Sequence, residues 1–116
     1  MGLFSNKNQF SNETFECKLC QREFNSDNYN AEFGLCNACM LIANSEIQSF
    51  SEAISLYQEK ANATNVPNEK IMYLRLMLDY LYEYKVKYVD NNIHLIDQDI
   101  DELIDDVIEC ISEAKR

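Results

Sequence analysis

Cys17-Lys18-Leu19-Cys20 and Cys36-Asn37-Ala38-Cys39 are the two stretches that decide how the first third of this 116-residue chain folds. Each is a C-x-x-C pair, and fifteen residues separate them. Two such pairs at this separation indicate a metal site, because four thiolates can bind one Zn²⁺ in a closed tetrahedron. A closed site leaves no position for an activated water. We therefore expect one structural zinc ion on Cys17, Cys20, Cys36 and Cys39, and no catalysis at the metal.

The residues around the cysteines predict how the site is built. Residues 40–44 favour a helix and contain no glycine that could close a second knuckle. Cys36 and Cys39 would then lie in the first turn of a helix, whose free N–H groups and positive end favour thiolate sulfur. Apolar alternation at residues 14–16, with Phe24 after the first pair, predicts a small β-hairpin. A hairpin knuckle plus a helix N-terminus is a treble clef; a zinc ribbon, with both pairs on hairpins, is the alternative.

The segment Gly34-Leu35-Cys36-Asn37-Ala38-Cys39 resembles the second half of a GATA-type zinc finger. The resemblance covers these six residues and, more loosely, the spacing from Cys17 to Cys39. It implies a treble-clef fold with the four cysteines as ligands. The chain departs from that family where the family reads DNA, since it has no Trp and no basic tail after Cys39. The resemblance therefore implies the fold and not DNA recognition.

The remaining residues predict a bundle of three helices. Apolar side chains recur every three or four residues up to about Ala63, and Pro67 is the only proline. A second helix is expected from about Asn68 to Val89, with two apolar stripes that make it either the central helix or one with an exposed aromatic face. A third is expected from about Asp97 to Ala114. The predicted fold is mainly α, with a treble-clef-like C4 zinc module packed on a three-helix bundle.

The predicted domain organisation is a flexible arm over residues 1–12 and one domain over 13–116. Within that domain, residues 13–43 would form the zinc module and residues 44–116 the bundle. Residues 86–96 form either the end of the second helix and a turn or a small hairpin. Cys110 shares a helical stripe with Leu103 and Val107, so we expect it to be a buried apolar residue.

Charge limits the partners. The formal net charge is −10, whereas direct nucleic-acid binding needs a basic surface that neutralises phosphates. An acidic protein is instead steered to basic surfaces, although acidic residues can also serve solubility alone. No apolar run is long enough for a membrane span, and residues 1–6 lack the pattern of a secretory signal. We expect the cytoplasm of a bacterial host cell.

Two surfaces are candidates for binding a partner. The first is a row of carboxylates on the third helix at spacings of three and four, which comprises Asp99, Glu102, Asp106, Glu109 and Glu113. The second is the tyrosine stripe of the second helix, which comprises Tyr73, Tyr80 and Tyr84. A solvated outer face and a buried core stripe are the respective alternatives.

No constellation of catalytic residues accompanies these surfaces. His94 is the only histidine, and the sequence has no phosphate-binding loop, so we expect no enzyme. In size, acidity and lack of catalytic residues the chain resembles the small inhibitors that phages carry against bacterial defence nucleases, including the anti-CRISPR proteins. That resemblance implies occlusion of a basic surface on a partner such as a guide-RNA nuclease of the Cas9 type. The alternative is a small bacterial adaptor or regulator that docks through its zinc module.

Overall fold

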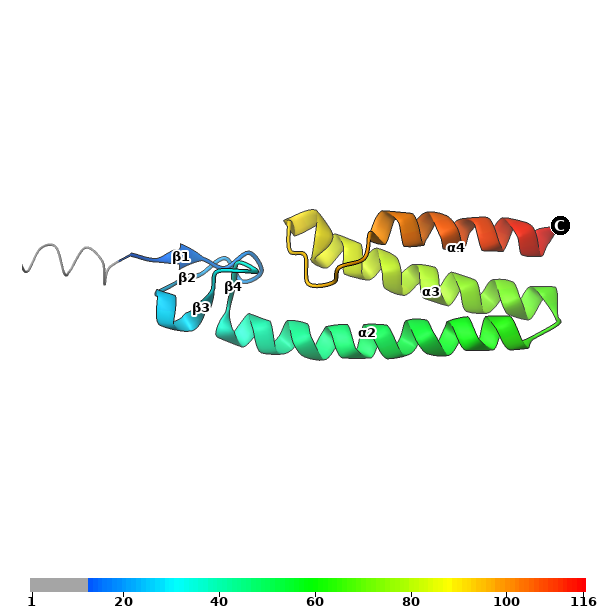
Figure 1. The fold of residues 1–116 in the computed structure, drawn as a ribbon, viewed down its shortest axis with the longest axis horizontal. Coiled ribbons are helices and arrows are strands. Elements are labelled where there is room, and N and C mark those ends of the chain that lie inside the picture. Colours follow the sequence, from blue (N-terminus) through cyan, green and yellow to red (C-terminus); the bar gives the residue numbers. More distant parts are fainter. Residues whose placement is uncertain (1–12) are drawn as a thin grey trace, which may run out of the picture. The chain divides into compact units, whose positions relative to one another are not determined.

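The computed structural model describes residues 13–116, so the arm predicted over residues 1–12 lies outside the described residues (Figure 1). The chain divides into two compact units between Asn44 and Ser45. Within the described range, the first unit holds four short strands and the second is helical. The prediction of a mainly helical fold with a small hairpin and a cluster of four cysteines is confirmed. The single domain expected over residues 13–116 stays a prediction.

The first unit is built from two antiparallel hairpins. Strand β1 (Phe15–Glu16) pairs with β2 (Glu23–Phe24), and Phe15 lies opposite Phe24. A 3-10 turn, η1 (Ser26–Asn28), leads to strand β3 (Tyr29–Asn30), which pairs with β4 (Leu35–Cys36). Helix α2 (Asn37–Ala63) begins directly after β4. The first hairpin was expected, and the second was not.

Aromatic stacking links the two hairpins. The rings of Phe15 and Tyr29 stack with centroids 5.1 Å apart, and the Tyr29 hydroxyl donates a hydrogen bond of 3.3 Å to the Glu16 carbonyl. Leu35 and Ala43 are fully buried. The apolar core of this unit is thus small, as expected for so short a segment.

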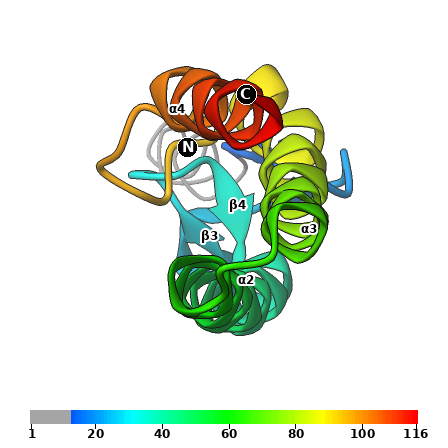
Figure 2. The same ribbon diagram turned by 90° about the vertical axis from the view of Figure 1, so that its right-hand side faces the viewer.

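The second unit is organised around helix α3 (Pro67–Lys87). Figure 2, which looks along the helices, shows α3 between α2 and helix α4 (Ile100–Lys115). The second helix was predicted to carry two apolar stripes, and its central position explains why it needs both. The buried side chains of this unit are Ala61, Leu74, Met77, Leu81, Tyr84, Tyr88, Ile93, Ile100, Ile104, Val107 and Ile111.

Local chemistry sets the helix ends. α3 begins with Pro67 in its first turn, where the missing N–H costs nothing. It ends at Lys87, and the 3-10 turn η2 (Val89–Asn91) follows. Asn92 closes that turn with φ of +61°, a left-handed conformation that asparagine tolerates. The alternative hairpin over residues 86–96 is not formed, because no strand lies there.

Helix α4 begins later than the predicted Asp97, because Asp99 caps it. The Asp99 side chain accepts a hydrogen bond of 3.2 Å from the Glu102 amide. Asp101 and Glu102 lie in the first turn and Lys115 in the last, as the helix dipole favours. The prediction for Cys110 is wrong: its side chain is exposed, because it lies at the edge of an open cleft between α4 and α2.

Among residues 13–116, no helix combines the length and the apolar composition that crossing a bilayer requires.

Candidate metal centre

The two hairpins and the start of α2 bring the four cysteine side chains together. Cys17 follows β1 and Cys20 lies in the turn after it, whereas Cys36 ends β4 and Cys39 lies in the first turn of α2. The four sulfur atoms all lie within 4.8 Å of one another. The predicted treble clef, with one pair on a knuckle and the other at a helix N-terminus, therefore describes the arrangement that the chain adopts.

The spacing of the sulfur atoms suits a tetrahedral metal ion. A metal–sulfur bond of about 2.3 Å requires sulfur atoms about 3.8 Å apart, and the Cys20 and Cys36 sulfur atoms are separated by 4.0 Å. Cys17 and Cys36 are buried, Cys39 is half-buried and Cys20 is exposed. The residues thus form a four-sulfur site that could hold one metal ion.

Backbone hydrogen bonds shape the knuckle at Cys17–Cys20. The Cys17 amide donates to the Arg22 carbonyl at 2.9 Å, and the Gln21 amide donates to the Cys17 carbonyl at the same distance. Gln21 has φ of +64°, which turns the chain back toward β2. These bonds hold the first two thiols on the same side of the hairpin.

Gly34 lets the second hairpin approach the first. The Lys18 amide donates a bond of 2.9 Å to the Gly34 carbonyl, so the knuckle is tied directly to the loop before β4. Gly34 has φ of +74°, and a Cβ added there would lie 2.6 Å from Cε of Lys18. The backbone conformation therefore favours glycine at this position, whereas the mobile end of the Lys18 side chain could move aside.

The backbone favours thiolate at one sulfur in particular. Burial raises the pKa of Cys17, but hydrogen bonds from the backbone amides of Cys36, Cys20 and Leu19 outweigh it and lower this pKa to about 6. Burial and the neighbouring sulfur atoms of Cys36 and Cys17 raise the pKa of Cys39 to about 12. The Cys39 thiol therefore resists ionisation without a cation, and binding of a metal would release its proton.

The start of α2 contributes to the same stabilisation. The Cys39 amide donates to the Cys36 sulfur at 3.4 Å, as an N-cap side chain would accept from the first turn of a helix. His94 is not part of the four-cysteine cluster, and its Nε2 lies 3.0 Å from Oδ1 of Asn92.

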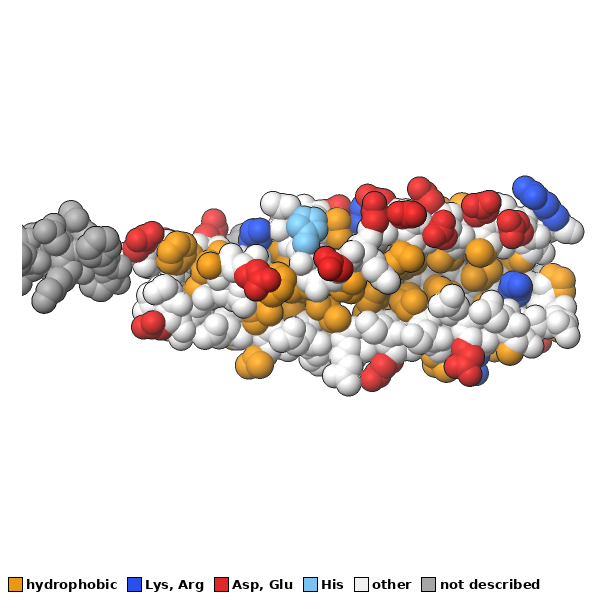
Figure 3. All heavy atoms as spheres, viewed as in Figure 1, with side chains coloured by type: hydrophobic (Ala, Val, Ile, Leu, Met, Phe, Trp, Pro, Cys, Tyr) orange, Lys and Arg blue, Asp and Glu red, His pale blue; other side chains and the backbone are white. Residues whose placement is uncertain are grey.

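The carboxylates predicted to bind a partner lie along α4. Asp99, Glu102, Asp106, Glu109 and Glu113 are all exposed, and Figure 3 shows a line of carboxylates along this helix. The Asp99 side chain caps α4 by accepting a hydrogen bond from the Glu102 amide. For the other four, the structure shows no ion pair within residues 13–116.

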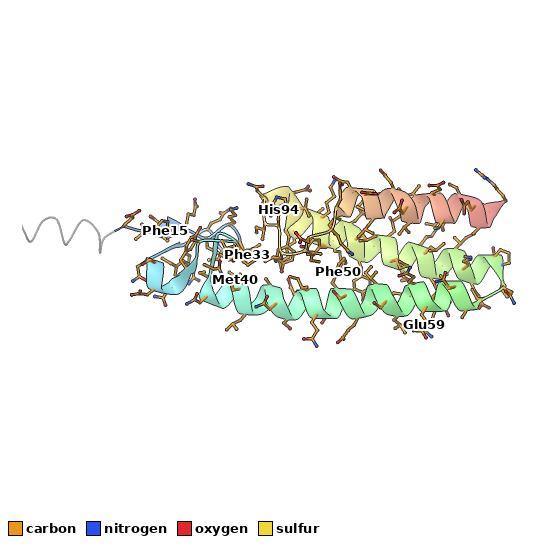
Figure 4. All side chains as sticks on the ribbon, in the orientation of Figure 1. Phe15, Phe33, Met40, Phe50, Glu59 and His94 are labelled. Carbon is orange, nitrogen blue, oxygen red and sulfur yellow. The ribbon has the colours of Figure 1, made fainter. Side chains whose placement is uncertain are left out.

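The tyrosine stripe lies at the contact between α3 and α2. Tyr57 of α2 stacks on Tyr73 with centroids 6.2 Å apart and lies 6.1 Å from the ring of Tyr80. Phe50 stacks on Tyr84 at 4.9 Å, and Figure 4 shows Phe50 between the two helices. Tyr84 is only 5% exposed. This corrects the idea of Tyr84 as a binding residue, because its ring fills the core; Tyr73 and Tyr80 are half-buried.

Sequence reasoning missed the second hairpin and the role of Gly34. The available signal was Asn30, whose side chain accepts a hydrogen bond from the Phe33 amide at 3.1 Å, followed four residues later by glycine. It also missed the cleft between α2 and α4, which periodicity cannot reveal.

Comparison of the chain with protein-family models, curated proteins and solved structures yields no match to any of them.

Proposed function

We propose that this chain is a non-enzymatic, zinc-stabilised protein that binds a basic surface of a partner protein through the exposed carboxylates of α4. The observation that carries the proposal is the charge of α4. Five of its exposed carboxylates, Glu102, Asp105, Asp106, Glu109 and Glu113, have no ion pair within residues 13–116, whereas Asp101 pairs with Lys85 at 2.8 Å.

Zinc is the metal that the four sulfurs favour. Tetrahedral sites made of four thiolates are typical of zinc or of iron–sulfur centres, and closed zinc sites of this type contribute to folding rather than to catalysis. Elemental analysis of purified protein should find one zinc per chain. A second metal, or iron in place of zinc, would contradict this part of the proposal.

The row on α4 has a cost that binding would offset. Glu102, Asp106, Glu109 and Glu113 are spaced by three or four residues, and like charges at these spacings destabilise a helix by a few tenths of a kcal/mol per pair. The repulsion falls when lysine or arginine side chains approach. Basic protein surfaces commonly hold nucleic acid, so the partner we propose is a nucleic-acid-handling protein whose binding surface is occluded. A bacterial guide-RNA nuclease of the Cas9 type, inhibited in the manner of anti-CRISPR proteins, is the specific target to test.

The test is inhibition of DNA cleavage by a guide-RNA-loaded nuclease. A variant with Glu102→Gln, Asp106→Asn, Glu109→Gln and Glu113→Gln should lose inhibition. The matched control neutralises four exposed carboxylates on α2 and α3, by Glu52→Gln, Glu59→Gln, Asp79→Asn and Glu83→Gln, and should retain it. Equal inhibition by both variants would refute a role for the α4 row.

A second candidate, an adaptor that docks through its metal module, is favoured by one observation. Leu41 and Ile42, in the first turns of α2, are 73% and 54% exposed. Replacing both by serine should abolish capture of the partner if the module is the docking surface, and should leave it intact if α4 is.

A further inference from the structure

An apolar cleft of about 210 Å³ opens between α2 and α4. Its lining includes Leu74, Met77 and Leu81 of α3, together with Ile54 of α2 and Leu103 of α4. All of these residues belong to the second unit. Figure 3 shows apolar side chains in the band between α4 and α2.

The two rims of this cleft differ in charge. On the α4 side Asp106 and Cys110 line it, and Glu102, Glu109 and Glu113 share the helical face of Asp106 by their spacing. On the α2 side Gln58 and Asn62 line it, and Ser51 and Ser55 lie on the same face of that helix. One rim is therefore strongly acidic and the other uncharged and polar.

We propose that this cleft binds an amphipathic helix of a partner protein, with the basic flank of that helix facing α4 and an uncharged polar flank facing α2. This inference rests on the proposed function and names the element of the partner that is recognised. The incoming helix would supply the fourth helix of a bundle, and its apolar stripe would contact Ile54 and Leu103, the half-buried apolar side chains of the lining, above the buried floor of Leu81 and Met77. Helix-in-groove recognition of this kind is a common mode of peptide binding.

Charge complementarity selects the occupant. The acidic row from Glu102 to Glu113 extends about 16 Å along α4, which matches lysine or arginine residues on about three turns of the incoming helix. A second copy of this chain fits poorly. Each copy carries a net charge of −10, and the basic residues of α4 are confined to Lys115 at its end.

Two synthetic peptides of about eighteen residues test the charge preference, a length that covers the 16 residues of α4. Both carry leucines at the a and d positions of a heptad. One carries lysines along one flank and the other carries glutamates at the same positions. The lysine peptide should bind the full chain at least about tenfold more tightly. Equal affinities would overturn the assignment of a basic helix.

Nuclear magnetic resonance locates the peptide. Amide shifts should change at Met77 and Leu81 in the floor and at Leu103 and Cys110 on the wall. Changes confined to the exposed carboxylates of α4 would indicate only an electrostatic attraction at the surface, and would overturn the proposal that the peptide binds in the cleft. A dimer that forms in the absence of peptide and blocks it would do the same, because the occupant would then be a second copy.

Tryptophan substitutions that fill the cleft test whether the peptide binds inside it. Cys110→Trp should fill the cleft from the α4 side and lower peptide affinity by at least about tenfold. Gln58→Trp should do so from the opposite wall. Ser112→Trp, an exposed position on another face of α4, is the matched control and should change affinity by less than about twofold. Circular dichroism checks that each variant keeps its helices.

The same variants separate this inference from the proposed function in the nuclease assay. Loss of inhibition by both the charge-neutralised variant and Cys110→Trp supports the cleft. If neutralising α4 abolishes inhibition and Cys110→Trp does not, the acidic face binds the partner and the cleft proposal is overturned. If both variants still inhibit the nuclease, both proposals are refuted.

Discussion

Removal of one metal ligand should unfold the first unit and leave the second helical. We consider Cys36→Ser, because Cys36 ends β4, is buried, and accepts a hydrogen bond from the Cys39 amide. Serine keeps the size of the side chain and removes the thiolate. The expected result is loss of zinc and loss of fixed structure over residues 13–44.

The magnitude follows from how little else holds this unit together. Among residues 13–44, the fully buried apolar side chains besides cysteine are Leu35 and Ala43, and burial of a leucine contributes about 1.5–3 kcal/mol. Its strands are two residues long, and isolated hairpins are marginal in water. Zinc contributes about 10–16 kcal/mol in finger peptides. The free energy of zinc binding therefore exceeds that of apolar burial several-fold. We expect the first unit to unfold when zinc is lost, because its apolar core alone is too small to hold it folded.

The assay combines metal analysis with amide spectra. Wild-type protein should bind one zinc per chain, and a strong chelator should reproduce the effect of Cys36→Ser. Amide signals of residues 13–44 should collapse to random-coil positions, whereas those of the α3–α4 core, such as Leu81 and Ile104, should persist. The matched control is Cys110→Ser, because Cys110 is exposed and lies outside the cluster.

One result would refute this reasoning. If Cys36→Ser or the chelated protein keeps dispersed signals for Phe15, Tyr29 and Leu35, the metal does not hold the hairpins together. Loss of zinc from Cys110→Ser would equally contradict the assignment of the four ligands.

Substitutions at three further positions test the second unit. Glu46→Gln should lower the free energy of unfolding by about 0.5 kcal/mol near neutral pH, a small value because the carboxylate is 44% exposed. A hydrogen bond from Lys87 lowers the pKa of Glu46 from its usual value. The stabilisation by the Glu46 carboxylate is therefore present above the usual glutamate pKa and is lost as pH falls through the lowered pKa. Urea melts of the wild type and of Glu46→Gln should then converge in acid. Asp99→Ala should cost about 1 kcal/mol in urea melts by removing the cap of α4, while Asp99→Asn, which can still cap, should cost less. Leu81→Ala should cost about 2–5 kcal/mol in the same melts, and a loss below about 1 kcal/mol would contradict its place in the core.

The four-cysteine cluster and the helix after it were predictable from sequence. The spacing of the four cysteines is a local feature of the sequence, because both C-x-x-C pairs and the apolar start of α2 lie within a short stretch. The second hairpin was not predictable by periodicity, because strands of two residues are too short to show alternation. β3 also follows a stretch rich in asparagine, aspartate and serine, which favours turns.

Cys110 shows the limit of helical periodicity in the second unit. The pattern correctly places it beside Leu103 and Val107 on α4, but periodicity tells only which residues share a face. The buried residues Ile100, Ile104, Val107 and Ile111 centre the contact on α3, and this rotates Cys110 to the edge of the cleft. Whether a second helix covers that edge depends on tertiary packing, which the pattern of one helix does not contain.

The proposed binding role of α4 rests on where its charge lies. Lys85 of α3 neutralises Asp101, while Asp105 and the row of Glu102, Asp106, Glu109 and Glu113 have no ion pair within the described part of the chain. The acidic row thus lies beside a cleft whose half-buried apolar walls are Ile54 and Leu103, and the proposed basic amphipathic helix would satisfy both in a single contact.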